Sequence, residues 1–342
     1  MKRNILETSI ASRDIEAFND QGNLFPRFTG NPGAHGTVCA ANDSNFDADH
    51  LSVPLNEFIV GAPEDEGLLD ILEAIAPSIP TARAFSYRTH DTKEQFQSDS
   101  DDDGDIREIG GDFSQVKRTG TKVDGRTDNK GLIMVLDNDQ GGEDAAVQQR
   151  AVLNLRSRLL RSDLRRCMTA LLAAANNTAK NWGGSATAPD PDVDLLEAVD
   201  RGGDARGVDS NLVILGGSAR IKRVKCLRGK TNPDMVGASL SNAQLAEFLG
   251  VDNVITLRNR YQSSATAKSK ILGDLALALQ SRKGAMPDDP SNIKRFVTMT
   301  PSGMVRVYVQ LMLKKTLVAV EHYSRVVITS TLGIEKLTIT YT

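Results

Sequence analysis

An aspartate-rich stretch between residues 97 and 111 has the side chains that bind calcium. Its carboxylates are Asp99, Asp101, Asp102, Asp103 and Asp105. Their spacing, with Gly104 before the last one, resembles the first places of a helix–loop–helix calcium loop, where carboxylates converge and glycine permits a sharp turn. The twelfth place should supply a bidentate glutamate but is Gly110, and the flanking segments alternate like strands. We therefore expect a solvated loop tip and no metal site.

A glycine-rich turn at Gly216, Gly217 and Ser218 could cradle a phosphate, because it follows an apolar run and opens a basic segment. Neither GxGxxG nor GxxxxGK followed by Ser or Thr is present, however. An ordinary strand-to-helix turn is therefore the expected structure. A nucleotide-using α/β enzyme stays open as an alternative, and it would need phosphate binding at residues 216–222.

The histidines show no catalytic or metal-binding spacing. They are His35, His50, His90 and His322, and neither an HExxH pair nor a GxSxG nucleophile turn occurs. Carboxylates are plentiful, but they lie in generally acidic loops that single out no pair with shifted pKa values. We therefore expect structural or solvated histidines, no catalytic residues, no cofactor, and a protein that is not an enzyme.

The chain of 342 residues is long enough for two or three domains, or for one discontinuous domain, with ample apolar content for a core. No apolar run approaches the roughly 20 residues of a membrane helix, and the first residues lack the apolar region of a signal peptide. The three cysteines, Cys39, Cys167 and Cys226, form no CxxC pair. We expect a soluble cytoplasmic product without membrane contact, disulfides or zinc.

Charge is divided unevenly along the chain. The net charge is −3, but residues 1–150 carry −14 and residues 151–342 carry +11. Such asymmetry can indicate a nucleic-acid surface, yet the basic residues form no single tail and aromatic residues do not alternate with them. The other interpretation is that acidic and basic parts of neighbouring copies meet.

The elements that could position these residues begin after an irregular start. Residues 1–62 mix Gly, Pro, Asn and Asp without a sustained period, which favours an extended arm. Residues 63–84 include EDEGLLDILEAIAPS, a short amphipathic helix stopped by Pro77. Residues 85–124 alternate on both sides of the aspartate-rich stretch, so we expect a long β-hairpin that turns there.

The clearest predicted element is one helix over residues 143–182, which holds no proline or glycine and would be about 60 Å long. Two glycines, Gly183 and Gly184, close it. Its apolar stripe is Leu153, Leu160, Leu164, Met168, Leu171 and Ala175, and beside the stripe lie Arg158, Arg161 and Arg165. The stripe keeps no strict heptad and ends in alanines, so packing across a sheet is favoured over a coiled coil.

From residue 210 onward the pattern is α/β. A buried strand, NLVILGG, precedes a short basic helix, SARIKRVKCLRG. The segment SNAQLAEFLGVDNVITL predicts a helix with a capping box of Ser241 and Gln244, a stop at Gly250, and a strand. Strands dominate the remainder, in RFVTMTP, GMVRVYVQLML, TLVAVEHYSRVVITST and EKLTITYT.

In this order of parts the chain resembles the major capsid proteins of tailed bacteriophages, which have the Hong Kong 97-like fold. The resemblance spans roughly residues 65–342 and is carried by KVDGRTDNKGLIMVLDND, LLRSDLRRCMTALLAAANNTAKNW, SNLVILGGSARIK and LAEFLGVDNVITLRNRYQ. It implies an α+β fold. Its parts would be an N-terminal arm (1–62), a short helix and lead-in (63–84), an extended β-hairpin loop (85–124), a peripheral domain with the spine helix (125–209), an α/β axial domain (210–300) and returning strands (301–342).

The resemblance also implies a shell protein whose hexamers and pentamers form an icosahedral capsid around double-stranded DNA, contacted non-specifically. Assembly would take place in the bacterial cytoplasm and end in the virion, with separate scaffolding, portal and decoration proteins as partners. An encapsulin-like compartment that packages protein cargo is an alternative.

In this family the extended loop lies over the adjacent subunit, which would give the aspartate-rich stretch a partner. We expect its five aspartates, Asp99, Asp101, Asp102, Asp103 and Asp105, to meet a basic helix flank on a neighbouring copy. That flank is formed by Arg158, Arg161 and Arg165.

Overall fold

The structure is a computed structural model, and it describes residues 50–61, 67–89, 109, 111, 120–183, 190–229, 235–282, 284, 286, 287, 289, 291–299 and 303–342. Within this part of the chain, no helix is both long and apolar enough to span a membrane.

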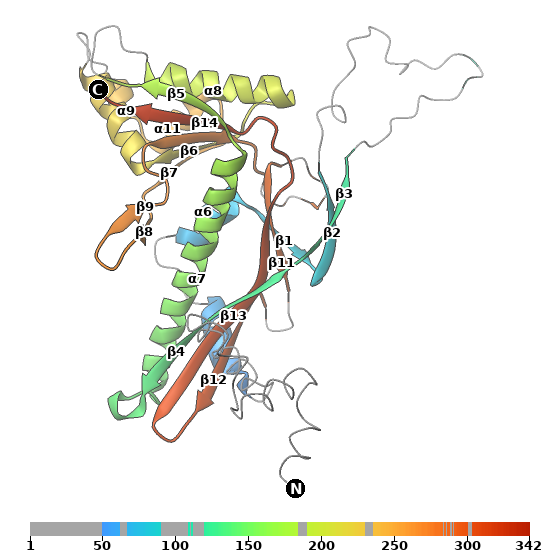
Figure 1. Ribbon diagram of the computed structural model, residues 1–342, viewed down its shortest axis with the longest axis vertical. Helices are drawn as coiled ribbons and strands as arrows, with labels where there is room; N and C mark the ends of the chain where they lie inside the picture. Colours follow the sequence, from blue (N-terminus) through green and yellow to red (C-terminus); the bar gives the residue numbers. More distant parts are fainter. Residues whose placement is uncertain are drawn as a thin grey trace, which may run out of the picture.

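Two five-stranded sheets and one long helix form the framework (Figure 1). The first sheet has the order β1-β11-β13-β12, and β4 also pairs with β13. Its strands are β1 (Ser78–Thr81), β4 (Asp128–Asp137), β11 (Ile293–Thr298), β12 (Val305–Leu311) and β13 (Lys315–Ile328). The second sheet has the order β5-β14-β10-β6-β7. Its strands are β5 (Asn176–Asn181), β6 (Leu212–Gly216), β7 (Asn253–Leu257), β10 (Leu275–Leu279) and β14 (Glu335–Thr340).

The long helix α7 (Ala145–Ala174) runs between the two sheets and is shorter than predicted (Figure 1). Asp144 caps it by accepting a hydrogen bond from the backbone N–H of Ala146 at 3.1 Å. Its 30 residues give a length of about 45 Å. Residues 176–181 leave the helix because their backbone pairs with β14 as the parallel strand β5. The prediction of one helix up to residue 182 is therefore wrong at its C-terminal end.

The buried face of α7 turns along its length, because its two halves pack against different sheets. In the second half, Leu164, Met168 and Leu171 are buried against the second sheet, as predicted. In the first half, Leu153 and Leu160 are only partly buried. The residues buried there are Val152, Leu155 and Leu159, which pack with Val307, Val318 and Val320 of the first sheet. The single straight apolar stripe predicted from the sequence could not pack against both sheets.

Helices cover both faces of the second sheet. On β6, Leu212 and Ile214 pack with α6 (Leu68–Ile75) and α7, whereas Val213 and Leu215 face the opposite layer, as alternation in a strand requires. That layer contains α8 (Pro191–Arg206), α9 (Gly217–Gly229) and α11 (Asn242–Leu249), with α10 (Met235–Ser239) between the last two. Helix α11 has the predicted capping box and ends at Gly250 in the left-handed conformation. The sequence therefore predicted this helix correctly.

The predicted hairpin over residues 85–124 is confirmed at its base. Strand β2 (Ala84–Arg88) pairs antiparallel with β3 (Lys122–Arg126). Phe85 stacks on Phe296 of β11, with ring centroids 4.2 Å apart. Gly125 gives this ring room, because a Cβ there would lie 2.8 Å from Phe85. The aspartates predicted at the turn lie outside the described residues.

The predicted extended arm contains a helix near its end. Helix α5 (Val53–Gly61) buries Leu55 and Ile59 against α7 and β12. Its Asn56 side chain accepts a hydrogen bond from the backbone N–H of Val307 at 2.8 Å. The prediction of an extended segment is therefore wrong for residues 53–61, because Leu55 and Ile59, one turn apart, have an apolar surface to cover.

Three short elements complete the description. They are the 3₁₀ turn η5 (Asn138–Gln140) and the two strands of a small hairpin, β8 (Arg260–Gln262) and β9 (Lys268–Lys270). The β8–β9 hairpin projects from the second sheet beside α7 (Figure 1), where Arg165 lies over the Tyr261 ring at 3.9 Å.

Candidate functional site

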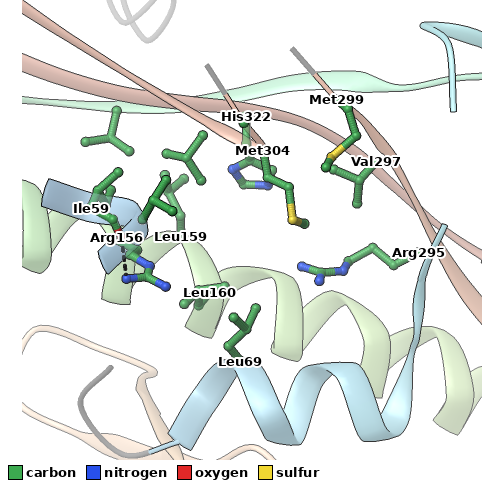
Figure 2. A pocket seen from close by; sticks show the side chains of 14 residues that line it. Ile59, Leu69, Arg156, Leu159, Leu160, Arg295, Val297, Met299, Met304 and His322 are labelled. Atoms are coloured by element: carbon green, nitrogen blue, oxygen red, sulfur yellow. Dashed lines mark hydrogen bonds between the residues drawn. The ribbon is translucent and has the colours of Figure 1, made fainter. Parts of the chain in front are cut away.

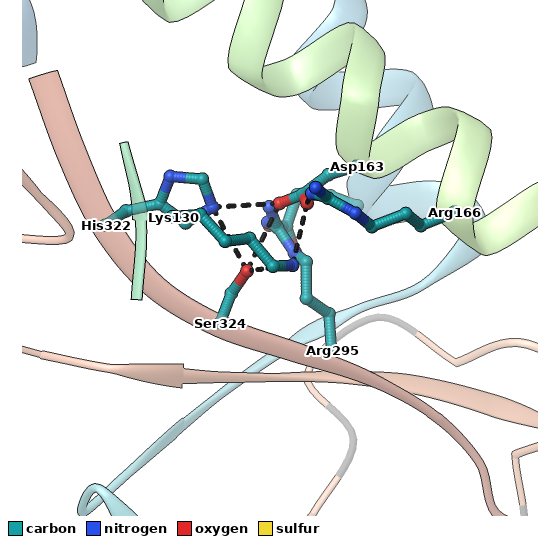
Figure 3. A network of polar contacts seen from close by, with 7 residues as sticks. Lys130, Asp163, Arg166, Arg295, His322 and Ser324 are labelled. Atoms are coloured by element: carbon teal, nitrogen blue, oxygen red, sulfur yellow. Dashed lines mark hydrogen bonds and ion pairs between the residues drawn. The ribbon is translucent and has the colours of Figure 1, made fainter. Parts of the chain in front are cut away.

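The most heavily hydrogen-bonded carboxylate of the described chain belongs to Asp163, on the buried face of α7 (Figure 3). It accepts hydrogen bonds from Lys130 Nζ at 2.8 Å and from Arg166 at 2.8 Å. His322 Nε2 lies 3.0 Å from its second oxygen, and Ser324 Oγ donates to the same oxygen at 3.2 Å. We call these five residues the Asp163 network.

Strand register explains how the Asp163 network forms. Lys130 on β4 lies opposite His322 on β13, and Ser324 follows two residues later on the same face of β13. Helix α7 then brings Asp163 and Arg166 over this face. One buried carboxylate thus joins β4 and α7, which follow each other in the sequence, to β13, which lies far along the chain.

Burial alone would raise the pKa of Asp163, but the hydrogen bond from His322 and the charge of Lys130 outweigh it. The pKa of this carboxyl is therefore held well below its usual range. An ionised carboxylate is an acceptor only, so Nε2 of His322 must carry the proton that it shares with Asp163.

Asp163, His322 and Ser324 have the residue types of a nucleophilic triad but not its geometry. In such a triad the carboxylate and the hydroxyl use different imidazole nitrogens. Here Asp163 lies 3.0 Å and Ser324 lies 3.1 Å from the same atom, Nε2. Ser324 is also fully buried and donates its hydroxyl proton to Asp163. The arrangement fastens α7 to the first sheet and has no free nucleophile.

An apolar cavity of about 320 Å³ lies next to this network, between α5, α6, α7 and the first sheet (Figure 2). Leu69, Leu159, Met299 and Met304 are among the side chains that line it. Its arginines have partners of their own: Arg156 donates to the carbonyl of Ile59 at 2.9 Å, and Arg295 forms an ion pair with Glu73. No described pair of titratable groups converges on the cavity in a way that would specify a reaction.

A second concavity, which basic side chains line, lies at the turn where the sequence raised the possibility of phosphate binding. It is lined by Gly217, Arg220, Ile221, Val224, Lys225, Arg258, Arg260 and Lys270, and its volume is about 390 Å³. The neighbouring Gly216 has a packing role, because a Cβ there would lie 2.2 Å from the carbonyl oxygen of Gly273. The double glycine alone therefore does not indicate a phosphate loop.

The predicted contact residues divide into described and undescribed groups. Arg158, Arg161 and Arg165 are exposed and lie on successive turns of α7. Their proposed partners, Asp99 to Asp105, lie outside the described residues, so the contact stays a prediction.

The remaining histidines and cysteines that the sequence singled out show no catalytic or metal-binding arrangement where the structure describes them. His35, His90 and Cys39 lie outside the described residues. Cys167 and Cys226 are buried, and burial raises the pKa of Cys167 to about 12, so Cys167 is no ready nucleophile. Among the described residues, no three His, Cys, Asp or Glu side chains are grouped so as to hold a metal.

The sequence analysis missed the Asp163 network, although two local signals were present. Asp163 interrupts the buried face of a helix, and His322 and Ser324 lie on the face of β13 that also carries the buried Val318 and Val320. A polar residue at a core position indicates a buried partner, but only the fold shows which one.

Comparisons with known proteins give matches among solved structures. No family model matches the chain, and no curated protein does. A phage-related protein from Bordetella bronchiseptica RB50 superposes with a TM-score of 0.62 at 13% identity, covering 84% of this chain and 96% of the other. The capsid structure of cyanophage P-SCSP1u has a TM-score of 0.46 at 10% identity, covering 79% and 88%. A virus-like particle from Pyrococcus furiosus has a TM-score of 0.44 at 10% identity, covering 79% of this chain and 96% of the other.

The first likeness extends over nearly the whole of the phage-related protein, and the two sheets, the long helix and the base of the extended hairpin occur in the predicted order. The chain thus shares the α+β fold of this phage-related protein, and its elements follow the order expected of the Hong Kong 97-like fold.

Proposed function

We propose that this chain is the major capsid protein of a tailed bacteriophage, assembled as hexamers and pentamers into an icosahedral shell around double-stranded DNA. One observation, beyond the fold, carries the proposal. The turn between β12 and β13 presents Leu311 and Leu313 with exposed fractions of 66% and 96%. An apolar turn that projects from the body of a subunit has surface to bury on another copy.

A second apolar surface supports the same proposal. Leu132, Ile133 and Val135 are exposed on β4, the strand that pairs with the same part of β13. Strand β4 and the β12–β13 turn lie together in the lower part of the view in Figure 1, so the two apolar surfaces are neighbours.

The direct test is to express the full chain, with a scaffolding protein supplied, and to examine it by size-exclusion chromatography and negative-stain electron microscopy. We expect capsomers or closed particles. A monodisperse 37 kDa monomer at high concentration would contradict the proposal. Double-stranded DNA inside particles from infected cells would favour a phage capsid, whereas particles filled with protein cargo would favour the encapsulin-like alternative.

The turn supplies a sharper variant. Changing Leu311 and Leu313 to lysine should block or misdirect assembly, because both positions then carry charge into an apolar contact. The matched control changes Val193, an exposed residue of α8 at 51%, to lysine. If the double variant assembles with the yield of the control, the β12–β13 turn is not an assembly contact.

The electrostatic contact between copies is a further part of the proposal. Each exposed pair between the aspartate-rich stretch and Arg158, Arg161 or Arg165 should contribute no more than about 1 kcal/mol, but the shell repeats the contact in every subunit. Replacing Asp99, Asp101, Asp102, Asp103 and Asp105 by lysine should therefore impair assembly, and leave the melting of the isolated subunit unchanged. Wild-type yield and salt dependence in this variant would exclude the contact.

A further inference from the structure

Two segments that form one concave surface are strongly basic, although the chain as a whole is acidic. Helix α9 and residues 258–270 together hold nine Lys and Arg and no Asp or Glu, whereas the whole chain has a net charge of −3. Five of these cations line the concavity beside Gly217: Arg220, Lys225, Arg258, Arg260 and Lys270. We call this surface the basic groove.

The described interaction partners of the cations in the basic groove are neutral groups. Arg220 donates to Thr256 Oγ1 at 2.9 Å and to the amide oxygen of Asn242, and Lys270 donates to Ser218. Lys225 lies 5.9 Å from the ring centre of Tyr341. Within the described part of the chain, none of the five forms an ion pair with a carboxylate.

Other cations of the same helix show that carboxylates are available nearby. Lys222 pairs with Asp274 at 3.1 Å, and Arg223 forms a buried pair with Asp192. Two of the five cations of α9 are therefore paired, whereas Arg220 and Lys225, which line the groove, form no ion pair with a described carboxylate.

Like charges are crowded in the groove. The pKa of Arg220 is lowered by burial first, and then by the positive charges of Arg258 and Arg223. An anion held among these side chains would relieve that repulsion. Planar guanidinium groups present paired N–H donors that match the oxygens of a phosphate, and Gly217 has no side chain to block the approach.

We propose that the basic groove binds the phosphate groups of nucleic acid. The identity of this polyanion rests on the proposed function, because in a capsid it is the packaged double-stranded DNA. Because the contacts are to phosphates, binding should be independent of base sequence and weaken steeply with salt.

The test uses the unassembled full-length subunit and short, labelled duplex DNA of mixed sequence, with binding followed by fluorescence anisotropy from about 50 to 200 mM salt. The variant changes Lys225, Arg258 and Arg260 to glutamine, which leaves the hydrogen-bonded Arg220 and Lys270 in place. We expect at least about a tenfold loss of affinity and a salt slope reduced by about two to three, since each phosphate contact contributes about 0.9 to that slope.

The matched control removes the same charge elsewhere by changing Lys122, Lys314 and Lys315, all exposed, to glutamine. It should keep the wild-type salt slope. Equal losses in the two triple variants would show a general effect of net charge and overturn the proposal, as would a wild-type subunit that does not bind duplex DNA at low salt.

Two competitors distinguish other sources of negative charge. A synthetic peptide of residues 97–111 tests whether the groove receives the acidic stretch of another copy, and ATP tests whether it receives a nucleotide. The nucleic-acid assignment is overturned if the peptide or ATP binds through the three changed residues and duplex DNA does not. Particle formation by the wild-type chain is scored separately by electron microscopy. Its failure would count against the proposed function, whereas the groove is judged by duplex DNA binding to the unassembled subunit alone.

Discussion

The Asp163 network and the basic groove both gather cations, but they treat the charge in opposite ways. In the network, Lys130 and Arg166 share one carboxylate, which also contacts the imidazole of His322, and the side chain of Lys130 is only 10% exposed. In the groove, five cations share none among the described residues, and three of them, Lys225, Arg258 and Arg260, are exposed. A buried charge must be paired inside the protein, whereas an exposed one can stay hydrated until a ligand arrives.

This difference separates structural from functional charge. In the network, the charges of Lys130 and Arg166 are compensated by the Asp163 carboxylate inside the protein. The groove leaves charge uncompensated at the surface, where it contributes little to the fold and can attract an anion. Substitutions in the two regions should therefore affect different measurements.

The largest expected effect is on stability, from changing Asp163 to asparagine. The variant keeps the shape of the side chain but leaves Lys130 buried without a counter-charge, which should lower the free energy of unfolding by about 3–5 kcal/mol. Urea denaturation of the subunit measures it. Asp200→Asn, at an exposed position of α8, is the control and should change stability by less than about 0.5 kcal/mol. A small effect of Asp163→Asn would mean that the network is not needed to hold α7 on the first sheet.

The second expected effect is on the pH dependence of the free energy of unfolding. The folded-state pKa of Asp163 is depressed, so its stabilisation is fully present above the unfolded-state value of 3.8 and is lost as the pH falls below it. This one group should add up to about 1.4 kcal/mol per pH unit to the slope in that range. Urea titrations below about pH 4 should show a shallower slope for Asp163→Asn than for the wild type. Parallel slopes would contradict the assignment.

A smaller effect is expected where the groove meets α7. Arg165 lies over the ring of Tyr261 in the β8–β9 hairpin, an interaction of about 0.5–1 kcal/mol at an exposed site. Tyr261→Leu should lose this stabilisation, whereas Tyr261→Phe should keep it because the ring remains. Equal melting temperatures for the two variants would show that the ring face contributes nothing.

The smallest effect on stability is expected in the basic groove itself. The triple change of Lys225, Arg258 and Arg260 to glutamine removes repulsion and no ion pair, so the free energy of unfolding should stay within about 0.5 kcal/mol of the wild type or rise. Adding duplex DNA should raise the melting temperature of the wild-type subunit and not that of the variant. If the variant is strongly destabilised, these three cations stabilise the fold, as those of the Asp163 network do.

Much of the secondary structure was predictable because its signals are local. The capping box of Ser241 with Gln244, the stop at Gly250 and the apolar run of β6 each lie within a few residues, and the elements form where these signals place them. The same holds for α6, whose apolar face and Pro77 define a short helix. The alternation of residues in β12, β13 and β14 likewise predicted strands.

The sequence by itself thus determined the order of the elements, and through that order the fold class, because periodicity, caps and turns act over a few residues. Tertiary structure decided where α7 ends, since residues 176–181 become a strand only by pairing with β14, far along the chain. It also decided which charges are paired. Asp163 meets His322, and Arg220 approaches Arg258, across long separations in sequence, and the energy of such a contact depends on burial and distance that exist only in the folded chain.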